Sequence, residues 1–222
     1  MISKQVSAMK IPSGKEKFAT FGAALSQTKG PAIKILLILA YMMWTTLLLT
    51  GHLVLFEYEM TASPLANTKR IFPAKSIVQM AKGRQNIILF LHPMCPCSMA
   101  SVDEFHELMR AGEKDSVGTV VAFMPQEMQS EWALQPVFSS LKRIRNVSIV
   151  YDTTGAQADI FGATTSGHVL IYDGRGILQF SGGITASRGH SGDNANFELA
   201  KKTILERNPK FVTTPVLGCA LR

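Results

Sequence analysis

The longest uncharged stretch of the chain runs from residue 35 to residue 56, ILLILAYMMWTTLLLTGHLVLF, and contains no Asp, Glu, Lys or Arg. A helix rises 1.5 Å per residue, so these 22 residues reach about 33 Å, enough to cross a hydrocarbon layer of about 30 Å. The only ionisable side chain in the stretch, His52, lies near its end, where lipid headgroups would be. The stretch therefore predicts a transmembrane helix over 35–56 and argues against a core helix of a soluble protein.

The charges on the two sides of this stretch differ. Residues 1–34 contain six lysines and one acid, a charge of +5, whereas Glu57 and Glu59 follow the stretch. Because basic segments stay in the cytoplasm, we predict a single-pass protein of the cell inner membrane with a periplasmic C-terminal domain. A cleaved signal peptide with a cleavage site in TASPLA (61–66) is the alternative. Apolar cores of signal peptides have about 7–15 residues, so the length favours an uncleaved anchor.

The rest of the chain is almost neutral. Beyond residue 34 it has 17 basic and 15 acidic residues, so most of the overall charge of +7 belongs to the N-terminal segment. A protein that binds nucleic acid presents a basic face to the phosphates, and this composition offers none. We therefore expect no nucleic-acid partner.

Residues 57–84 are mixed and polar and predict a tether that ends in a short entry element, AKSIVQMAK. The region 85–210 then alternates continuous apolar runs, typical of buried strands, with amphipathic stretches typical of helices. Strands are predicted over 86–91, 117–124 and 147–152, and helices over 98–110, 130–144 (interrupted at Pro136) and 154–162.

A hairpin follows these elements, with Gly174-Arg175-Gly176 as its turn, and a last helix is predicted over 193–208 with Asp193 as its N-cap. Residues 211–222 are expected to form a C-terminal tail. Strands that alternate with helices favour parallel pairing, and the hairpin adds antiparallel strands. The predicted fold is α/β, with a mixed central sheet flanked by helices.

Two of the three cysteines, Cys95 and Cys97, are separated by one proline and lie where the first buried strand gives way to a helix. The start of a helix presents free N–H groups and a partial positive charge, which stabilise a thiolate. A disulfide between thiols so close in sequence closes a small, strained ring and is readily reduced. The pattern favours a redox pair over two inert buried thiols.

The same sulfurs allow a metal site. Cys95 and Cys97, with His92 or Cys219, would offer soft ligands suited to Cu(I) or Zn. Cys219 itself is open to three interpretations: a resolving cysteine, a third metal ligand, or a loose thiol in the tail. The redox interpretation requires no cofactor; Cu(I) belongs to the alternative, a copper-binding or metallochaperone module.

Four segments carry a resemblance to a known family: FLHPMCPCSMAS, TSGHVLIYDGRG, FSGGITASRGHSGDNA and TPVLGC. Over about residues 70–210 the order of elements resembles the thioredoxin-like fold, and the four segments together resemble RedB-type membrane-anchored redoxin-like proteins. The resemblance implies a thiol–disulfide oxidoreductase that acts on a protein thiol or disulfide partner. With the turn, it implies that Cys95 attacks and Cys97 resolves, or the reverse.

The chain departs from the thioredoxin pattern in two places. Met94 stands where the first cysteine of a C-x-x-C motif would be, and Thr165-Ser166-Gly167 stands where thioredoxins have a cis-proline. Peroxiredoxins also lack that proline, so a peroxidase, with Arg188 stabilising the thiolate, is a further alternative.

Two histidines are also considered. His168 begins a predicted strand and is interpreted as structural. The segment 184–195, with Arg188 and His190, is interpreted as a turn and helix cap; the alternative is that both side chains approach the cysteines and tune their pKa.

Overall fold

The computed structural model describes residues 30–64, 67–206 and 210–222 and divides into two compact units, with the boundary after Leu55. The first unit contains most of helix α2 (Pro31–Met60), which is longer at both ends than the predicted span and has no buried residue. Within the described ranges it is the one helix long and apolar enough to cross a membrane.

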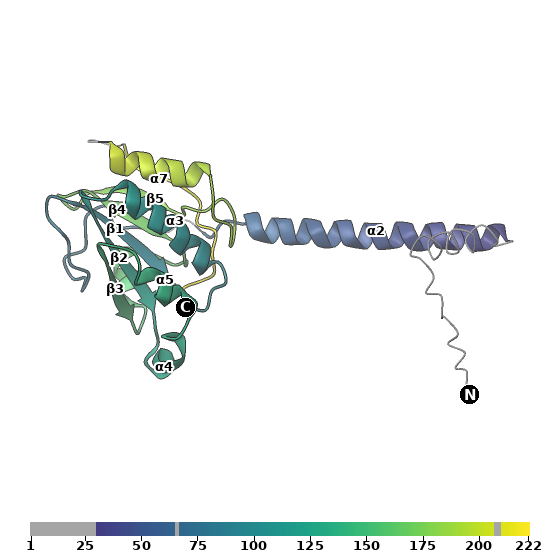
Figure 1. The fold of residues 1–222 in the computed structure, drawn as a ribbon, viewed down its shortest axis with the longest axis horizontal. Coiled ribbons are helices and arrows are strands. Elements are labelled where there is room, and N and C mark those ends of the chain that lie inside the picture. Colours follow the sequence, from purple (N-terminus) through teal and green to yellow (C-terminus); the bar gives the residue numbers. More distant parts are fainter. Residues whose placement is uncertain (1–29, 65–66, 207–209) are drawn as a thin grey trace, which may run out of the picture. The chain divides into compact units, whose positions relative to one another are not determined.

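The second unit is built on a six-stranded sheet in the order β3-β2-β1-β4-β5-β6 (Figure 1). Pairs β1–β2, β2–β3 and β5–β6 are parallel, and β1–β4 and β4–β5 are antiparallel. The strands are β1 (Gln85–Leu91), β2 (Ser116–Phe123), β3 (Val147–Asp152), β4 (Val169–Tyr172), β5 (Leu178–Gly182) and β6 (Val212–Thr213).

Successive side chains of β1 enter different cores because a strand points alternate residues to opposite faces. Ile87 and Leu89 join a cluster with residues of α3, α5 and α7, and Ile88 and Phe90 join a second cluster with residues of α6. Figure 1 shows the three helices of the first cluster in front of the sheet. The helices are α3 (Ser98–Ala111), α4 (Gln129–Trp132), α5 (Pro136–Leu141), α6 (Ala156–Phe161) and α7 (Ala195–Leu205), with a 3-10 turn at Gln126–Met128.

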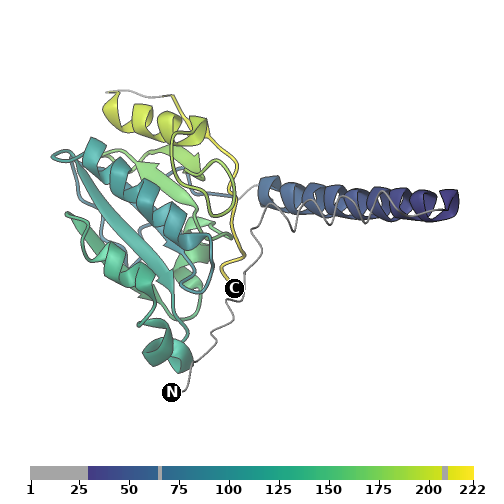
Figure 2. The same ribbon diagram turned by 45° about the vertical axis from the view of Figure 1, so that its right-hand side comes forward.

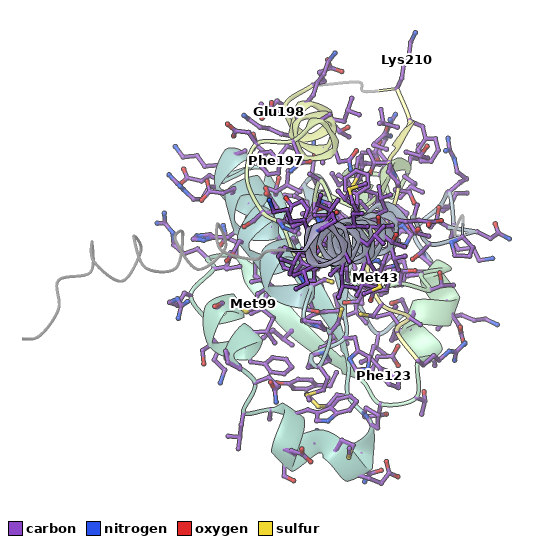
Figure 3. All side chains as sticks on the ribbon, turned by 90° about the vertical axis from the view of Figure 1, so that its right-hand side faces the viewer. Met43, Met99, Phe123, Phe197, Glu198 and Lys210 are labelled. Carbon is purple, nitrogen blue, oxygen red and sulfur yellow. The ribbon has the colours of Figure 1, made fainter. Side chains whose placement is uncertain are left out.

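A mixed sheet covered by helices on both faces, with the cysteine turn between β1 and α3, is the predicted thioredoxin-like fold, and this prediction is confirmed. Figure 3 labels Phe197 of α7, which packs against the first core, and Lys210, whose exposed side chain projects where the described chain resumes.

Two local predictions were wrong, and a third was confirmed. AKSIVQMAK forms turns and bends instead of a helix or strand; only Val78 of this stretch is buried among the second cluster. The N-cap of α7 is Asn194, whose side chain accepts from Phe197 N, because Asp193 lies one residue too early for that bond. The interruption predicted at Pro136 in the helix over 130–144 is confirmed: the stretch is divided into α4 and α5, and Pro136 begins the second helix at its first position.

Candidate functional site

The cysteine turn connects β1 to α3 and is closed by short-range hydrogen bonds. Cys95 N donates to His92 O at 3.1 Å, and Ser98 N donates to Cys95 O at 3.0 Å. The Ser98 hydroxyl also donates to His92 O at 2.8 Å. Cys97 occupies the N-cap position of α3, with Cys95 in the turn before it. The predicted strand-to-helix position of both cysteines is correct.

The C-terminal segment is packed against the domain and leads to the same turn. After β6 it passes Gly183, where Thr214 Oγ1 donates to Gly183 O at 2.6 Å. It then runs antiparallel to residues 164–166, with an isolated bridge between Thr165 and Ala220. In Figure 2 the segment (yellow) descends past the sheet toward the start of α3. The interpretation of Cys219 as a loose tail thiol is therefore wrong.

The three sulfur atoms meet in one cluster. Cys95 Sγ lies 2.7 Å from Cys219 Sγ, and the sulfurs of Cys95, Cys97 and Cys219 all lie within 4.8 Å of one another. Cys95 is 5% exposed and Cys97 9% exposed, while Cys219 is half-buried. In the described part of the chain this is the one group of three or more metal-ligating side chains close enough to share an ion.

The cluster makes its three thiols unequal in acidity. Burial raises the pKa of the Cys95 thiol, but hydrogen bonds from the Cys219 thiol and from the backbone N–H groups of Cys219 and Cys97 outweigh it, so this pKa lies below its ordinary value. Burial, with the neighbouring Cys95 charge, raises the pKa of Cys97. Burial and its bond to Cys95 raise the pKa of Cys219 to about 12. Cys95 is thus the sulfur that ionises most easily.

Arg188 reaches the cluster, whereas His190 does not. The Arg188 guanidinium donates to Gly218 O, next to Cys219, and its charge partly offsets the raised pKa values of Cys97 and Cys219. His190 is exposed, and its ring nitrogen Nδ1 lies 2.9 Å from Ser187 Oγ. His190 therefore belongs to the turn that was predicted for 184–195. Arg188 instead follows the alternative interpretation, in which the side chain affects the pKa values of the cysteines.

His92 does not join the sulfur cluster. Its ring packs against Trp132, with centroids 5.0 Å apart, and its Nδ1 accepts from Met94 N at 3.2 Å. Burial lowers the pKa of His92. Of the two candidates for a third ligand beside Cys95 and Cys97, the structure therefore brings Cys219 and not His92.

Ser166 takes a connecting role at the place where thioredoxins have the cis-proline. Its hydroxyl accepts from His92 N at 2.9 Å and lies 3.1 Å from Ser98 Oγ, and its backbone N donates to Cys219 O at 2.9 Å. No peptide bond in the described ranges is cis. Ser166 thus ties the cysteine turn to the C-terminal segment through ordinary trans backbone.

His168 is only half satisfied. Its Nε2 lies 2.9 Å from Ser181 Oγ, whereas Nδ1 is buried without a hydrogen-bond partner. Burial lowers the pKa of His168 to about 4, so the ring is neutral in the folded protein at pH 7. The structural interpretation made from the sequence agrees with this buried position directly before β4.

The four segments that carried the family resemblance converge here. The first contains the cysteine turn, the second Ser166, the third Gly183 and Arg188, and the fourth the approach to Cys219. The sequence did not indicate that Cys219 contacts Cys95. The available signal in the sequence was Gly218, directly before Cys219, since a glycine can mark a close approach of two backbone segments. In the structure a Cβ on Gly218 would lie 2.0 Å from Ser166 O.

No family model and no curated protein matches this chain. Among solved structures, it is similar to a hypothetical protein of Sinorhizobium meliloti, at 13% identity and a TM-score of 0.52, covering 73% of this chain and 94% of the other. An uncharacterised conserved protein of Geobacillus kaustophilus matches at 17% identity and a TM-score of 0.48, covering 73% and 96%. At these identities the likeness concerns the fold.

A secreted disulfide oxidoreductase of Mycobacterium tuberculosis, described as homologous to DsbE of Escherichia coli, also matches. The identity is 15%, the TM-score 0.40, and the match covers 57% of this chain and 84% of the other. This likeness gives no information on the chemistry of this chain, which depends on its own sulfur cluster.

Proposed function

We propose that this chain is a membrane-anchored, extracytoplasmic thiol–disulfide oxidoreductase of the RedB type. The observation that supports it is the environment of Cys95, whose sulfur is hydrogen-bonded by the Cys219 thiol and by two backbone N–H groups. A thiolate is the form that attacks a disulfide, and Cys95 is the thiol whose pKa is lowered. Cys97, predicted from the sequence to resolve, and Cys219 both lie within reach.

The anchor in this proposal is α2. Its 30 residues extend about 45 Å, and the uncharged stretch 35–56 inside it is sufficient to cross the bilayer. The lysines before it and the glutamates after it favour a cytoplasmic N-terminus. The redox domain then faces the periplasm of the inner membrane, where protein disulfides persist and partner thiols or disulfides are available.

Turnover of a disulfide probe by the full-length protein in detergent tests the proposal. The probe is a peptide that releases a fluorescent thiol when its disulfide exchanges, with dithiothreitol as the final reductant. We expect Cys95→Ser to lower the rate by at least about a thousandfold, as loss of a nucleophile does. An unchanged rate in Cys95→Ser would show that the chemistry resides elsewhere. Consumption of hydrogen peroxide with a sulfenic acid at Cys95 would instead favour the peroxidase alternative.

A second candidate function, a copper-binding or metallochaperone module, is favoured by one specific observation. Three cysteine sulfurs within 4.8 Å of one another are a suitable ligand set for Cu(I). Titration of the reduced, full-length protein with Cu(I) against a competing chelator tests it. One tightly held Cu(I) that is lost in each single Cys→Ser variant, together with no turnover of the disulfide probe, would favour the module over the oxidoreductase.

A further inference from the structure

The sulfur that should attack is covered. Cys95 is 5% exposed, and Cys219 Sγ stands 2.7 Å from its sulfur. To exchange with Cys95, a partner sulfur must come to bonding distance, about 2.05 Å, of the same atom. The place that a partner sulfur needs is therefore occupied by Cys219, and exchange requires that the C-terminal segment move.

Few bonds hold this segment beside the turn. Its backbone makes two hydrogen bonds to residues 164–166: Ser166 N donates to Cys219 O at 2.9 Å, and Leu221 N donates to Thr164 O at 3.0 Å. Leu221 is buried in the second core, and Arg222 pairs with Asp159 on the surface. Segments with so few contacts open locally without unfolding the domain.

The segment crosses the neighbouring backbone at a defined point. A Cβ on Gly218 would lie 2.0 Å from the backbone oxygen of Ser166, so only glycine allows this approach. The Arg188 guanidinium donates to Gly218 O at the same point. Gly218 and Arg188 thus fix where the segment leaves the body of the domain and where Cys219 arrives.

We propose that residues 218–222 form a strap that carries the resolving thiol, so that Cys219 closes a disulfide with Cys95 and the strap lifts from residues 164–166 to admit an extended, cysteine-bearing segment of a partner protein. This inference rests on the proposed function, because it needs Cys95 to exchange disulfides. It assigns resolution to Cys219 instead of Cys97. Pairing of an extended segment with free backbone groups is a common mode of peptide recognition, and here the chain's own strap occupies the backbone groups of residues 164–166.

The chemistry balances as two exchanges. The Cys95 thiolate attacks one sulfur of the partner disulfide, that S–S bond breaks, and the second partner sulfur leaves as a thiolate. Cys219 then gives its proton to that thiolate and attacks Cys95 Sγ, which breaks the mixed disulfide and releases the first partner sulfur as a thiolate. The partner gains two electrons and becomes a dithiol, and the chain is left with a Cys95–Cys219 disulfide. A dithiol of another partner reverses the sequence.

Mapping the disulfide formed with oxidised glutathione tests the strap. The full-length, reduced protein in detergent is mixed with one equivalent, quenched in acid, alkylated and analysed by peptide mass spectrometry. We expect a Cys95–Cys219 cross-link in the wild type and in Cys97→Ser. In Cys219→Ser we expect a Cys95–glutathione adduct that persists at least a hundredfold longer. A Cys95–Cys97 cross-link in the wild type, with the persistent adduct in Cys97→Ser, would overturn the inference.

Gly218→Ala tests the docking while leaving all three thiols in place. We expect the added methyl to displace the strap from Ser166 O and to slow closure of the Cys95–Cys219 bond at least tenfold. Ala220→Ser, at an exposed position of the same strap, is the matched control and should close at the wild-type rate. Closure at the wild-type rate in Gly218→Ala would refute the role of the docked strap.

The two proposals fail in different ways. If Cys95 forms no adduct with glutathione in any variant, the oxidoreductase itself is wrong. If the Cys95 adduct forms but is resolved by Cys97, only the strap is wrong.

Discussion

The turn at residues 92–98 and the segment at 214–221 bring cysteines to the same cluster by different means. Within the turn, hydrogen bonds join residues two to six positions apart, as between Cys95 and His92, and Ser166 bonds the turn from far along the chain. In the segment they join residues thirty or more positions apart, as between Thr214 and Gly183. Local bonds fix a conformation wherever the turn forms, whereas long-range bonds exist only once the sheet is assembled.

The two regions therefore make different contributions to the site. The turn holds Cys95 rigidly at the start of α3, and the segment brings both a second thiol and a backbone N–H to its sulfur. The pKa of Cys95 therefore depends on the C-terminal segment, the part that we propose moves away from the turn. Moving the segment away would expose Cys95 and at the same time remove part of what stabilises its thiolate.

The largest effect on the free energy of unfolding is expected at His168, the buried residue directly before β4. The unfolded histidine protonates near pH 6.5, whereas the folded one does so only at about 4. Between these values the unfolded state binds a proton that the folded state does not, so the free energy of unfolding should fall as the pH falls, by up to about 3 kcal/mol. Urea unfolding of the full-length protein in detergent from pH 7 to pH 4 measures this.

His168→Gln should remove most of that pH dependence, because the amide can still bond the Ser181 hydroxyl but does not titrate. His106→Gln, at an exposed position of α3, is the control and should retain the wild-type slope. An unchanged slope in His168→Gln would mean that another group titrates, and that His168 does not cause the loss of stability at low pH.

Ser166→Ala should weaken the turn directly, because the hydroxyl that bonds His92 N and Ser98 Oγ is lost. It should weaken the segment indirectly, because the residues 164–166 that pair with the segment lose these bonds to the turn. The substitution leaves the half-buried His92 N–H without its acceptor, which costs about 1 kcal/mol in the free energy of unfolding. The same variant should also accelerate hydrogen exchange at the Leu221 amide. Ser130→Ala, at an exposed site on α4, should change neither quantity. Exchange that is faster only in the turn would show that the two regions are independent.

Cys219→Ala should raise the pKa of Cys95, because the thiol that donates to its sulfur is removed. Thiolate absorbance near 240 nm, recorded against pH in a Cys97→Ser background, isolates the Cys95 titration. Cys219→Ser keeps a hydroxyl donor and should shift the pKa less than Cys219→Ala. A Cys95 pKa that is the same in all three proteins would show that the turn alone sets its acidity.

The smallest effect is expected from Arg222→Glu. Arg222 pairs with Asp159 on the surface, and exposed pairs contribute less than about 1 kcal/mol. Exchange at the Leu221 amide should accelerate by no more than about fivefold, which corresponds to that energy. Arg145→Glu breaks a more exposed pair with Glu113 elsewhere and should leave hydrogen exchange at the Leu221 amide unchanged. If Arg222→Glu accelerated this exchange more than Ser166→Ala does, the Arg222–Asp159 pair would stabilise the docked segment more than its contacts with residues 164–166 do.

Much of the fold follows from the sequence because the signals are local. The apolar run at 86–91 becomes the strand β1, and the amphipathic stretch at 98–110 becomes the helix α3. The prediction fails where a local pattern has no tertiary support, as in AKSIVQMAK, which forms no regular element. The two-residue strand β6 was missed because its pairing with β5 leaves no periodic pattern in so short a stretch.

The sequence by itself determined that this chain has an apolar helix able to span a membrane, and that Cys95 and Cys97 lie at the start of a helix. Both depend on residues adjacent in the chain, whose spacing fixes length and local conformation. Only the tertiary structure decided that Cys219 and Arg188 reach the site and that His92 and His190 do not. Cys219 is 124 positions from Cys95, and only the folded domain brings residues 164–166 to the place where they pair with the segment that carries Cys219 to Cys95.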